Sequence, residues 1–245
     1  MSGSPNPGVD QATTERVPTQ RVRWKATFRL VPSRYPPIDL FERIADPTDW
    51  ELLYELEAMT NPRLRQEAGQ ISMVPPSRRV SGPGAYVVMA PFTHVGTCRP
   101  TRFSNGAYGV YYAGRKFETA VYEVAYHMGR FYAATADSPH EETFRTYKGR
   151  IDKAMHDLRG GDWSQFLDPD PEQYGQPQEL GRRLRETGSN GIVYPSVRHA
   201  KGECIAAFWP DVVSIPIATK RITLKWNGKK ISEWFDYEND TWSKL

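Results

Sequence analysis

The stretch "YGVYYAGRKFETAVYEVAYHM", residues 108–128, constrains the fold of this chain more than any other part of the sequence. Residues 108–113 have the aromatic and β-branched composition of a strand. Residues 117–128 carry apolar side chains at helical spacing, ending at Met128, and predict a helix with an apolar stripe. Glu123 lies beside that stripe, so the sequence predicts a carboxylate at the boundary between the core and a cleft.

Short apolar runs bounded by turn residues predict further strands. They cover residues 24–31, 85–92, 191–195, 203–209 and 212–217. Helices and strands alternate without the regularity of a parallel βαβ sheet, so the predicted class is α+β.

Three other segments have local signals of their own. Residues 177–188 form an amphipathic pattern that predicts a helix with Gly188 as its C-terminal cap. The Asn227-Gly228 pair between two alternating runs predicts a hairpin with a type I′ turn. Residues 135–175 contain several Asp, Pro and Gly and only short periodic pieces, which predicts a surface excursion with a helix or two.

The composition changes along the chain and predicts three parts. Residues 1–20 are rich in small and polar residues and predict a disordered tail. Residues 21–77 predict an N-terminal extension with one strand and helices between residues 38 and 64. Residues 78–245 hold the remaining strands and are expected to form one domain.

Charge and hydropathy exclude several classes of function. The 32 basic and 29 acidic residues give a net charge of +3 without a basic stripe, so direct binding of nucleic acid is not expected. No run approaches the roughly 18 apolar residues of a membrane span, and the N-terminus lacks the apolar core of a secretory signal. The expected location is therefore the cytosol, with no membrane partner.

The cysteine and histidine residues give no sign of a metal site. Cys98 and Cys204 are too few for a disulfide framework, and the sequence has no CxxC motif. His94 and Cys98 are four residues apart, but Gly96 between them argues against a helix that would place both on one metal. No metal is predicted, and two reduced thiols are expected.

Three residues become candidates for chemistry through their order along the chain. Taken singly, Arg102 fits a solvated surface arginine, Glu123 an exposed helix residue and Ser196 a turn residue. Together they resemble the RES domain family, which is named for its Arg, Glu and Ser. The residues that carry the resemblance are Arg102-Phe103, Tyr111-Tyr112-Ala113, Glu118-Thr119-Ala120, Glu123 and Ser196. The resemblance covers roughly residues 78–218.

The resemblance implies an ADP-ribosyltransferase-like fold with a mixed or antiparallel sheet and surrounding helices. It also implies an enzyme that cleaves NAD⁺ at the nicotinamide–ribose bond and passes ADP-ribose to water, phosphate or a protein. Members of the family are toxins of bacterial toxin–antitoxin pairs, so a cognate Xre-type antitoxin is the expected partner. NAD⁺ would be a consumed substrate, since no GxGxxG follows a strand and no bound cofactor is expected. A homo-oligomer stays an open alternative.

The residue types suit these implied roles. Glu123 would stabilise positive charge on the ribose as the N-glycosidic bond breaks. Arg102 would pair with the pyrophosphate through its planar guanidinium. Tyr111 would stack on a ring of the substrate. Ser196 would hydrogen-bond the ribose or the carboxylate, and Arg198 would reach a phosphate.

One position departs from the family pattern. An earlier family arginine is expected at the end of the strand before Arg102, and His94 stands in about that place. Two expectations follow for His94. It either binds the ribose in place of the family arginine, or it is a turn histidine without a role. In the second case, Arg78 or Arg79 would fold back over the phosphates.

A competing interpretation assigns no chemistry to the cleft. The same residues would then form a binding module that holds a nucleotide or a protein partner without turnover.

Overall fold

The computed structural model describes residues 16–35, 69–96 and 100–245. The predicted helices between residues 38 and 64, the first fifteen residues of the predicted tail, and Cys98 lie outside the described residues.

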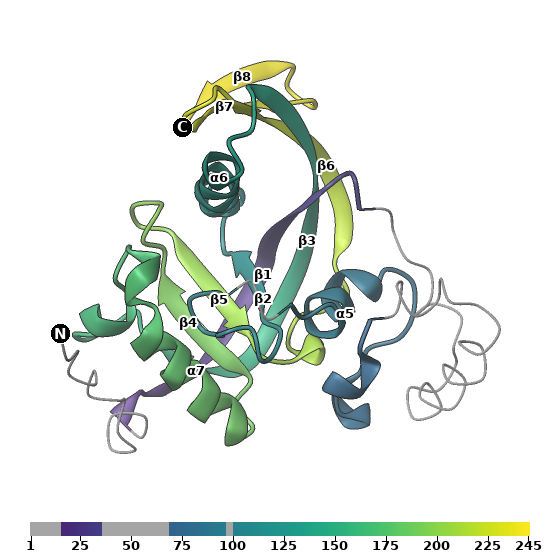
Figure 1. Ribbon diagram of the computed structural model, residues 1–245. Coiled ribbons are helices and arrows are strands. Elements are labelled where there is room, and N and C mark those ends of the chain that lie inside the picture. The colour runs from purple at the N-terminus through teal and green to yellow at the C-terminus, as the bar shows by residue number, and fades with distance from the viewer. Residues whose placement is uncertain (1–15, 36–68, 97–99) are drawn as a thin grey trace.

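One mixed sheet organises the described part of the chain (Figure 1). Its strands are β1 (Thr19–Pro32), β2 (Tyr111–Gly114), β3 (His140–Asp157), β4 (Gly191–Pro195), β5 (Glu203–Ala207), β6 (Ile217–Trp226), β7 (Ile231–Asp236) and β8 (Thr241–Lys244). The order is β1-β2-β5-β4-β3-β6-β7-β8, and β1 also pairs with β3, so the first five strands in this order close into a ring. The β3–β4 pair is parallel and the other pairs are antiparallel. The predicted α+β class is confirmed.

The strand β1 joins the predicted N-terminal extension to the rest of the fold. It pairs with β3 from Thr19 opposite His156 to Pro32 opposite Phe144. It begins inside the predicted disordered tail, where the preceding Val17 is 4% exposed. The strand predicted over residues 24–31 is therefore present and longer, and it is an integral part of the sheet.

The long strand β3 takes up residues 140–157 of the surface excursion predicted over residues 135–175, and loops with two 3₁₀ turns follow it. Its inward side chains, among them Phe144, Ile151 and Met155, are at most 3% exposed. The pairing with β6 shifts register between Arg145 and Tyr147, so the strict alternation expected of a strand is interrupted there. Because of that irregularity and the many charged outward side chains, the hydropathy pattern did not predict a strand here.

Two predicted strands are wrong. Residues 85–92 form the helix α5 (Tyr86–Thr93), in which Val88 and Met89 are 0% exposed. A short apolar run that is buried on several sides has no periodicity that separates helix from strand. Residues 213–216, between the 3₁₀ turn that ends at Val212 and the start of β6 at Ile217, are irregular apart from one bridge between Val213 and Ile151.

The two other helices of the described residues fall where the sequence predicts them. These are α6 (Phe117–Ala134) and α7 (Gly175–Glu186). Gly188 follows α7 with a φ of +80°, which confirms its role in the helix end. Short 3₁₀ turns complete the fold at Ile71–Met73, Pro76–Arg78, Ser164–Phe166, Pro171–Gln173 and Pro210–Val212.

The C-terminal hairpin is present, but its predicted turn type is wrong. A type I′ turn needs a positive φ at both central residues. Trp226 pairs with Ile231, which leaves a four-residue loop in which Gly228 has a positive φ and Asn227 does not.

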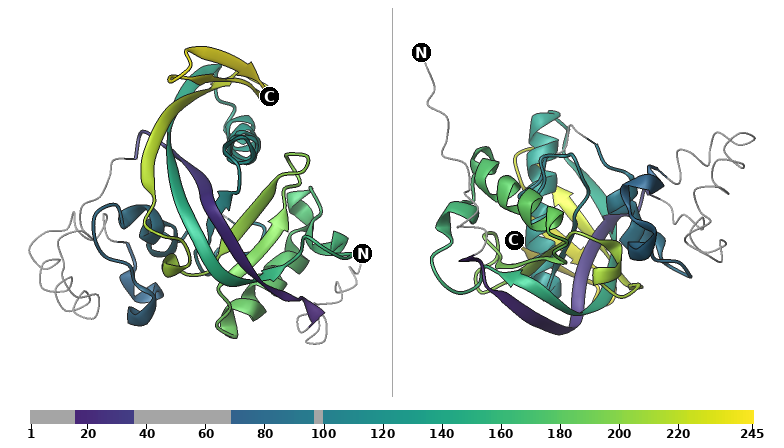
Figure 2. Two further views of the ribbon diagram at one scale, coloured as in Figure 1. Left: turned by 180° about the vertical axis from the view of Figure 1, so that it is seen from behind. Right: turned by 90° about the horizontal axis from the view of Figure 1, so that it is seen from below.

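The helix α6 lies on the concave side of the sheet, under the arch that β6, β7 and β8 form (Figures 1 and 2). Its buried face includes Phe117, Val121 and Ala125, which pack with Ile222 and Leu224. None of the helices among the described residues has the length and apolar character that a membrane crossing requires.

Candidate active site

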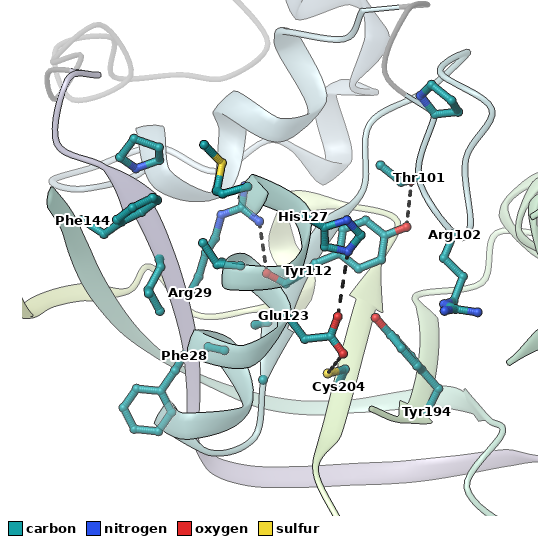
Figure 3. A pocket seen from close by; sticks show the side chains of 18 of the residues that line it. Phe28, Arg29, Thr101, Arg102, Tyr112, Glu123, His127, Phe144, Tyr194 and Cys204 are labelled. Atoms are coloured by element: carbon teal, nitrogen blue, oxygen red, sulfur yellow. Dashed lines mark hydrogen bonds and ion pairs between the residues drawn. The ribbon is translucent and has the colours of Figure 1, made fainter. Parts of the chain in front are cut away.

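A pocket of about 280 Å³ lies beside α6 (Figure 3). The strands β1, β2 and β5 contribute to its walls, and so do the loop before β2 and the end of β4. Gly114 ends β2 at the point where α6 comes closest, since a Cβ there would lie 2.8 Å from the backbone nitrogen of Ala120. The missing side chain therefore lets α6 pack against β2 and carry Glu123 into the pocket.

Glu123 is held from two sides. Its Oε1 accepts a hydrogen bond of 2.6 Å from the Ser196 hydroxyl and a longer one of 3.7 Å from the Cys204 thiol. Burial and the nearby carboxylate raise the pKa of the Cys204 thiol well above its ordinary value, so the thiol keeps its proton and donates it. The sequence prediction that Glu123 and Ser196 share one site agrees with this geometry.

The Ser196 hydroxyl is oriented by the turn that follows β4. Its oxygen accepts hydrogen bonds from the backbone N–H groups of Arg198 and His199, at 3.2 and 3.0 Å. With these two donors on its oxygen, the hydroxyl proton points to Glu123. Ser196 therefore positions the carboxylate and does not line the pocket itself.

His127 stands one helical turn after Glu123, and its Nε2 lies 3.9 Å from Oε2 of Glu123 (Figure 3). Lost hydration, followed by the charges of Arg198, Arg102 and Arg130, lowers the pKa of His127 to about 4. His127 lines the pocket, and 53% of its side chain is exposed. The imidazole is therefore neutral near pH 7.

Arg102, which was predicted to pair with the pyrophosphate, enters the same pocket from the loop before β2. The residue is 6% exposed and is fixed by the backbone oxygens of Phe166 and Asp168, at 3.1 and 2.8 Å. Its guanidinium also lies 4.6 Å from the ring centroid of Tyr174. Within the described residues no carboxylate pairs with it, so its charge is available to an anion.

Of the two adjacent tyrosines of β2, Tyr112 lines the pocket and Tyr111 does not. Adjacent residues of a strand face opposite sides, and here Tyr111 is 1% exposed within the core while Tyr112 lines the pocket. The Tyr112 hydroxyl donates to Oγ1 of Thr101 at 2.8 Å and accepts from the backbone N–H of Phe103 at 3.1 Å. Tyr112 thereby holds the two residues that flank Arg102. Tyr111, which was predicted to stack on a ring of the substrate, therefore does not line the pocket, and its neighbour Tyr112 does.

Arg29 is a charged pocket residue that sequence reasoning missed. It projects from β1, donates to the Tyr112 carbonyl oxygen at 3.1 Å and lies 4.8 Å from the ring centroid of Tyr111. Its Nε is buried and has no hydrogen-bond partner among the residues that the structure describes, and burial lowers the pKa of the guanidinium. An arginine stays charged in a protein even so. A buried cation without a carboxylate partner among the described residues marks a place for an anion.

A single signal in the sequence pointed to Arg29. In "WKATFRLV" an arginine stands inside an apolar strand, where a charged side chain needs a partner or a role. The segment lies far before Arg102 along the chain, and only the β1–β2 and β1–β3 pairings bring it to the pocket.

The other predicted binding residues do not line the pocket. His94 is exposed at the end of α5. Arg198 donates to the Pro169 carbonyl oxygen and covers the Tyr126 ring beside the pocket. Arg78 pairs with Asp211 at 3.0 Å, and Arg79 donates to the Val74 carbonyl oxygen at 2.8 Å. The second guanidinium of the pocket, which the sequence predicted at Arg78 or Arg79, is therefore that of Arg29.

The described residues contain no group of three or more His, Cys, Asp or Glu side chains arranged to hold a metal ion. The donors around the pocket are guanidinium, hydroxyl and thiol groups, which suit an anionic or sugar-like ligand.

These features define an α+β domain whose pocket presents one positioned carboxylate and two guanidinium groups to an anionic ligand. The family model of the RES domain matches residues 76–227, which is more than half of the chain. The chain belongs to the RES domain family. The match begins after β1, so Arg29 lies outside the matched residues.

Two further similarities accompany the family match. The chain is 26% identical over 214 residues to the uncharacterized protein y4oC of Sinorhizobium fredii, with 86% of this chain and 87% of that protein covered. It is also similar to a chain in the crystal structure of the M. tuberculosis MbcT–MbcA toxin–antitoxin complex, at 10% identity and a TM-score of 0.46. That similarity covers 90% of this chain and 95% of the other.

Proposed function

We propose that this RES domain protein cleaves the nicotinamide–ribose bond of NAD⁺ and acts as the cytosolic toxin of a toxin–antitoxin pair. One observation carries the proposal: the Glu123 carboxylate, fixed by Ser196, shares a pocket with two guanidinium groups that have no carboxylate partner within the described part of the chain. NAD⁺ needs both features. Its pyrophosphate requires cations, and its ribose needs a negative charge nearby when the bond breaks.

The bond breaks with its electron pair leaving on nicotinamide, whose ring nitrogen thereby loses its positive charge. The ribose is left with oxocarbenium character, as in glycoside hydrolysis. Oε1 of Glu123 is occupied by Ser196 and Cys204, so Oε2 is the oxygen available to the sugar. A nucleophile then bonds to the anomeric carbon and loses its proton. Water, phosphate and a protein side chain all satisfy this chemistry.

The guanidinium groups supply binding in this scheme. Arg29 and Arg102 reach the pocket from different segments, β1 and the loop before β2, and both are partly fixed by backbone oxygens before any ligand arrives. Such preorganisation reduces the entropy lost on binding. The pocket volume lies near the lower end of small-molecule sites, roughly 300 Å³, so we expect the nicotinamide–ribose end inside and the remainder at the mouth.

The proposed activity is tested by nicotinamide release from NAD⁺ by the purified protein, with and without phosphate. Glu123→Gln is expected to lower the rate by at least about a hundredfold, because the loss of a transition-state charge interaction costs roughly 3 kcal/mol or more. Glu118→Gln is the matched control, since Glu118 is an exposed carboxylate of the same helix. Thermal protection by NAD⁺ without nicotinamide release would instead support a binding module.

The toxin role is tested by expression in cells with and without the neighbouring antitoxin gene that the family leads us to expect. Growth arrest with falling NAD⁺, relieved by Glu123→Gln, is the expected result. Arrest with unchanged NAD⁺ would contradict the proposed chemistry.

A further inference from the structure

A second hollow, the basic groove, runs along the opposite face of α6 and has a volume of about 520 Å³. It lies between α6, the turn after β4 and the loop of the β6–β7 hairpin. The cations that line it are Arg130, Arg198, Lys229 and Lys230. The whole chain carries a net charge of only +3, so this is a local concentration of positive charge.

Among the described residues, no side-chain carboxylate neutralises the cations of the basic groove. No Asp or Glu of the described residues lines the groove, and Arg130, Lys229 and Lys230 take part in no ion pair among those residues. Arg130 and both lysines are exposed. Elsewhere on the surface, arginines pair regularly with acids, as Arg182 does with Glu179. Uncompensated cations lining a concave surface attract an anionic partner.

The groove also has apolar walls. Tyr122, Tyr126, Ile231 and Leu245 contribute to them, and Ala125, Gly129 and Ala133 lie one helical turn apart along α6. These small side chains leave room on the helix surface. An occupant that combines carboxylates with apolar side chains matches these walls and cations together.

The tyrosine rings argue against a nucleotide as the occupant. The guanidinium of Arg198 lies 3.4 Å from the ring centroid of Tyr126. The Tyr122 ring is stacked on His199, with centroids 4.7 Å apart and an interplanar angle of 10°. Each ring therefore has a face already taken, whereas binding of bases relies on free aromatic faces.

We propose that the basic groove binds an acidic, partly apolar polypeptide segment of a protein partner. The anionic side chains of that segment contact Arg130, Lys229 and Lys230, and its apolar side chains contact Ile231 and the tyrosine edges. The partner docks against α6 next to the active-site pocket. The proposal does not depend on NAD⁺ cleavage, because these three cations do not line that pocket.

The test measures fluorescence anisotropy of labelled probes with the full-length protein. The probes are a peptide of repeated glutamate and leucine with serine spacers, the same peptide with lysine for glutamate, and single-stranded DNA. The wild type is expected to bind the acidic peptide and to lose affinity as salt rises. Lys229→Glu/Lys230→Glu is expected to weaken binding roughly tenfold, because two attractive surface contacts become repulsive.

The matched control is Lys25→Glu/Arg150→Glu, an equal charge change in another exposed hollow of the surface. It is expected to bind the acidic peptide within about twofold of the wild type. Arg130→Gln is a second test variant that leaves the hairpin intact and is expected to weaken binding as well. Nicotinamide release serves as an independent readout, and Lys229→Glu/Lys230→Glu should leave it unchanged.

Three results would overturn the proposal. They are no binding of the acidic peptide by the wild type, equal weakening in the control variant, and tighter binding of DNA than of the peptide through the same lysines. Loss of nicotinamide release in Glu123→Gln with intact peptide binding would support the proposed activity and leave the groove proposal standing. Loss of peptide binding in Lys229→Glu/Lys230→Glu with intact nicotinamide release would support the groove proposal and leave the proposed activity standing.

Discussion

The Ser196 hydroxyl donates a 2.6 Å hydrogen bond to Oε1 of Glu123, although the two residues are 73 positions apart in the chain. Ser196 belongs to the turn after β4, and Glu123 to the middle of α6. The bond therefore connects the sheet to the helix across the pocket wall. It fixes one carboxylate oxygen of Glu123 and leaves the other for a ligand. The orientation of this carboxylate therefore depends on the positions of both the helix and the turn.

Ser196→Ala is expected to reduce kcat for nicotinamide release by roughly tenfold to a hundredfold, because a hydrogen bond to a charged group contributes about 1.5–3 kcal/mol. The carboxylate remains but is free to change rotamer. Steady-state kinetics check this, with Ser138→Ala as an exposed control. A fall in kcat as deep as that of Glu123→Gln would show that the serine does more than position the acid.

Arg29→Gln is expected to raise KM for NAD⁺ by roughly tenfold or more while kcat falls less, since the residue would bind a phosphate away from the breaking bond. Arg23→Gln is the control on the same strand, because its side chain is 72% exposed and does not line the pocket. Equal KM values for Arg29→Gln and the wild type would remove Arg29 from the binding site.

The two adjacent tyrosines of β2 are expected to respond differently. Tyr112→Phe removes the hydroxyl that holds Thr101 and Phe103, so KM for NAD⁺ rises and unfolding becomes easier by about 1–3 kcal/mol. No hydrogen bond of the Tyr111 hydroxyl is found within the described residues, so Tyr111→Phe should retain activity. Activity assays and urea unfolding of both variants decide the matter. Loss of activity in Tyr111→Phe alone would reverse the assignment.

Gly114→Ala is expected to destabilise the fold by about 1–3 kcal/mol and to lower activity, since overpacking at this contact pushes α6 away from β2. Gly160→Ala is the control, because a Cβ there meets nothing within 4 Å and its φ is not in the left-handed region. Urea unfolding of both variants gives the comparison. An unchanged midpoint for Gly114→Ala would show that the helix shifts at little cost.

Local signals in the sequence were sufficient for the parts of the site that lie close together along the chain. The helix with Glu123, the strand 191–195 and the turn with Ser196 each have a short-range pattern of spacing, caps or turn residues. The side of β2 that faces the pocket was not determined by such a pattern. Period-two alternation says that Tyr111 and Tyr112 face opposite ways, but only the packed neighbours decide which one meets the pocket.

The parts that the sequence did not predict depend on long-range pairing. β3 is held by β1 on one side and by β6 and β4 on the other, and its charged outward residues resemble a loop when read alone. Arg29 belongs to the pocket because β1 crosses the sheet beside β2. A charged residue in an apolar strand gives a reason to look for a partner, but not the identity of that partner.

Lowering the pH is expected to destabilise the protein through His127. The folded pKa of about 4 lies below the ordinary value, so between these two values the unfolded chain binds a proton at this residue and the folded chain does not. The stabilising contribution is complete above about pH 6.5 and is lost as the pH falls through 4. Because the ring is half exposed, screening reduces the effect to about 1 kcal/mol.

His127→Gln removes this proton uptake and should flatten the loss of unfolding free energy between about pH 7 and about pH 4.5. Burial lowers the pKa of His156 in the same direction, so the variant retains part of the slope, and His156→Gln should remove a further part. Urea unfolding of the three proteins at both pH values measures the difference. Parallel curves of unfolding free energy against pH for His127→Gln and the wild type would contradict the prediction. They would show that the folded protein does not lower the pKa of the His127 imidazole, which would then be well hydrated.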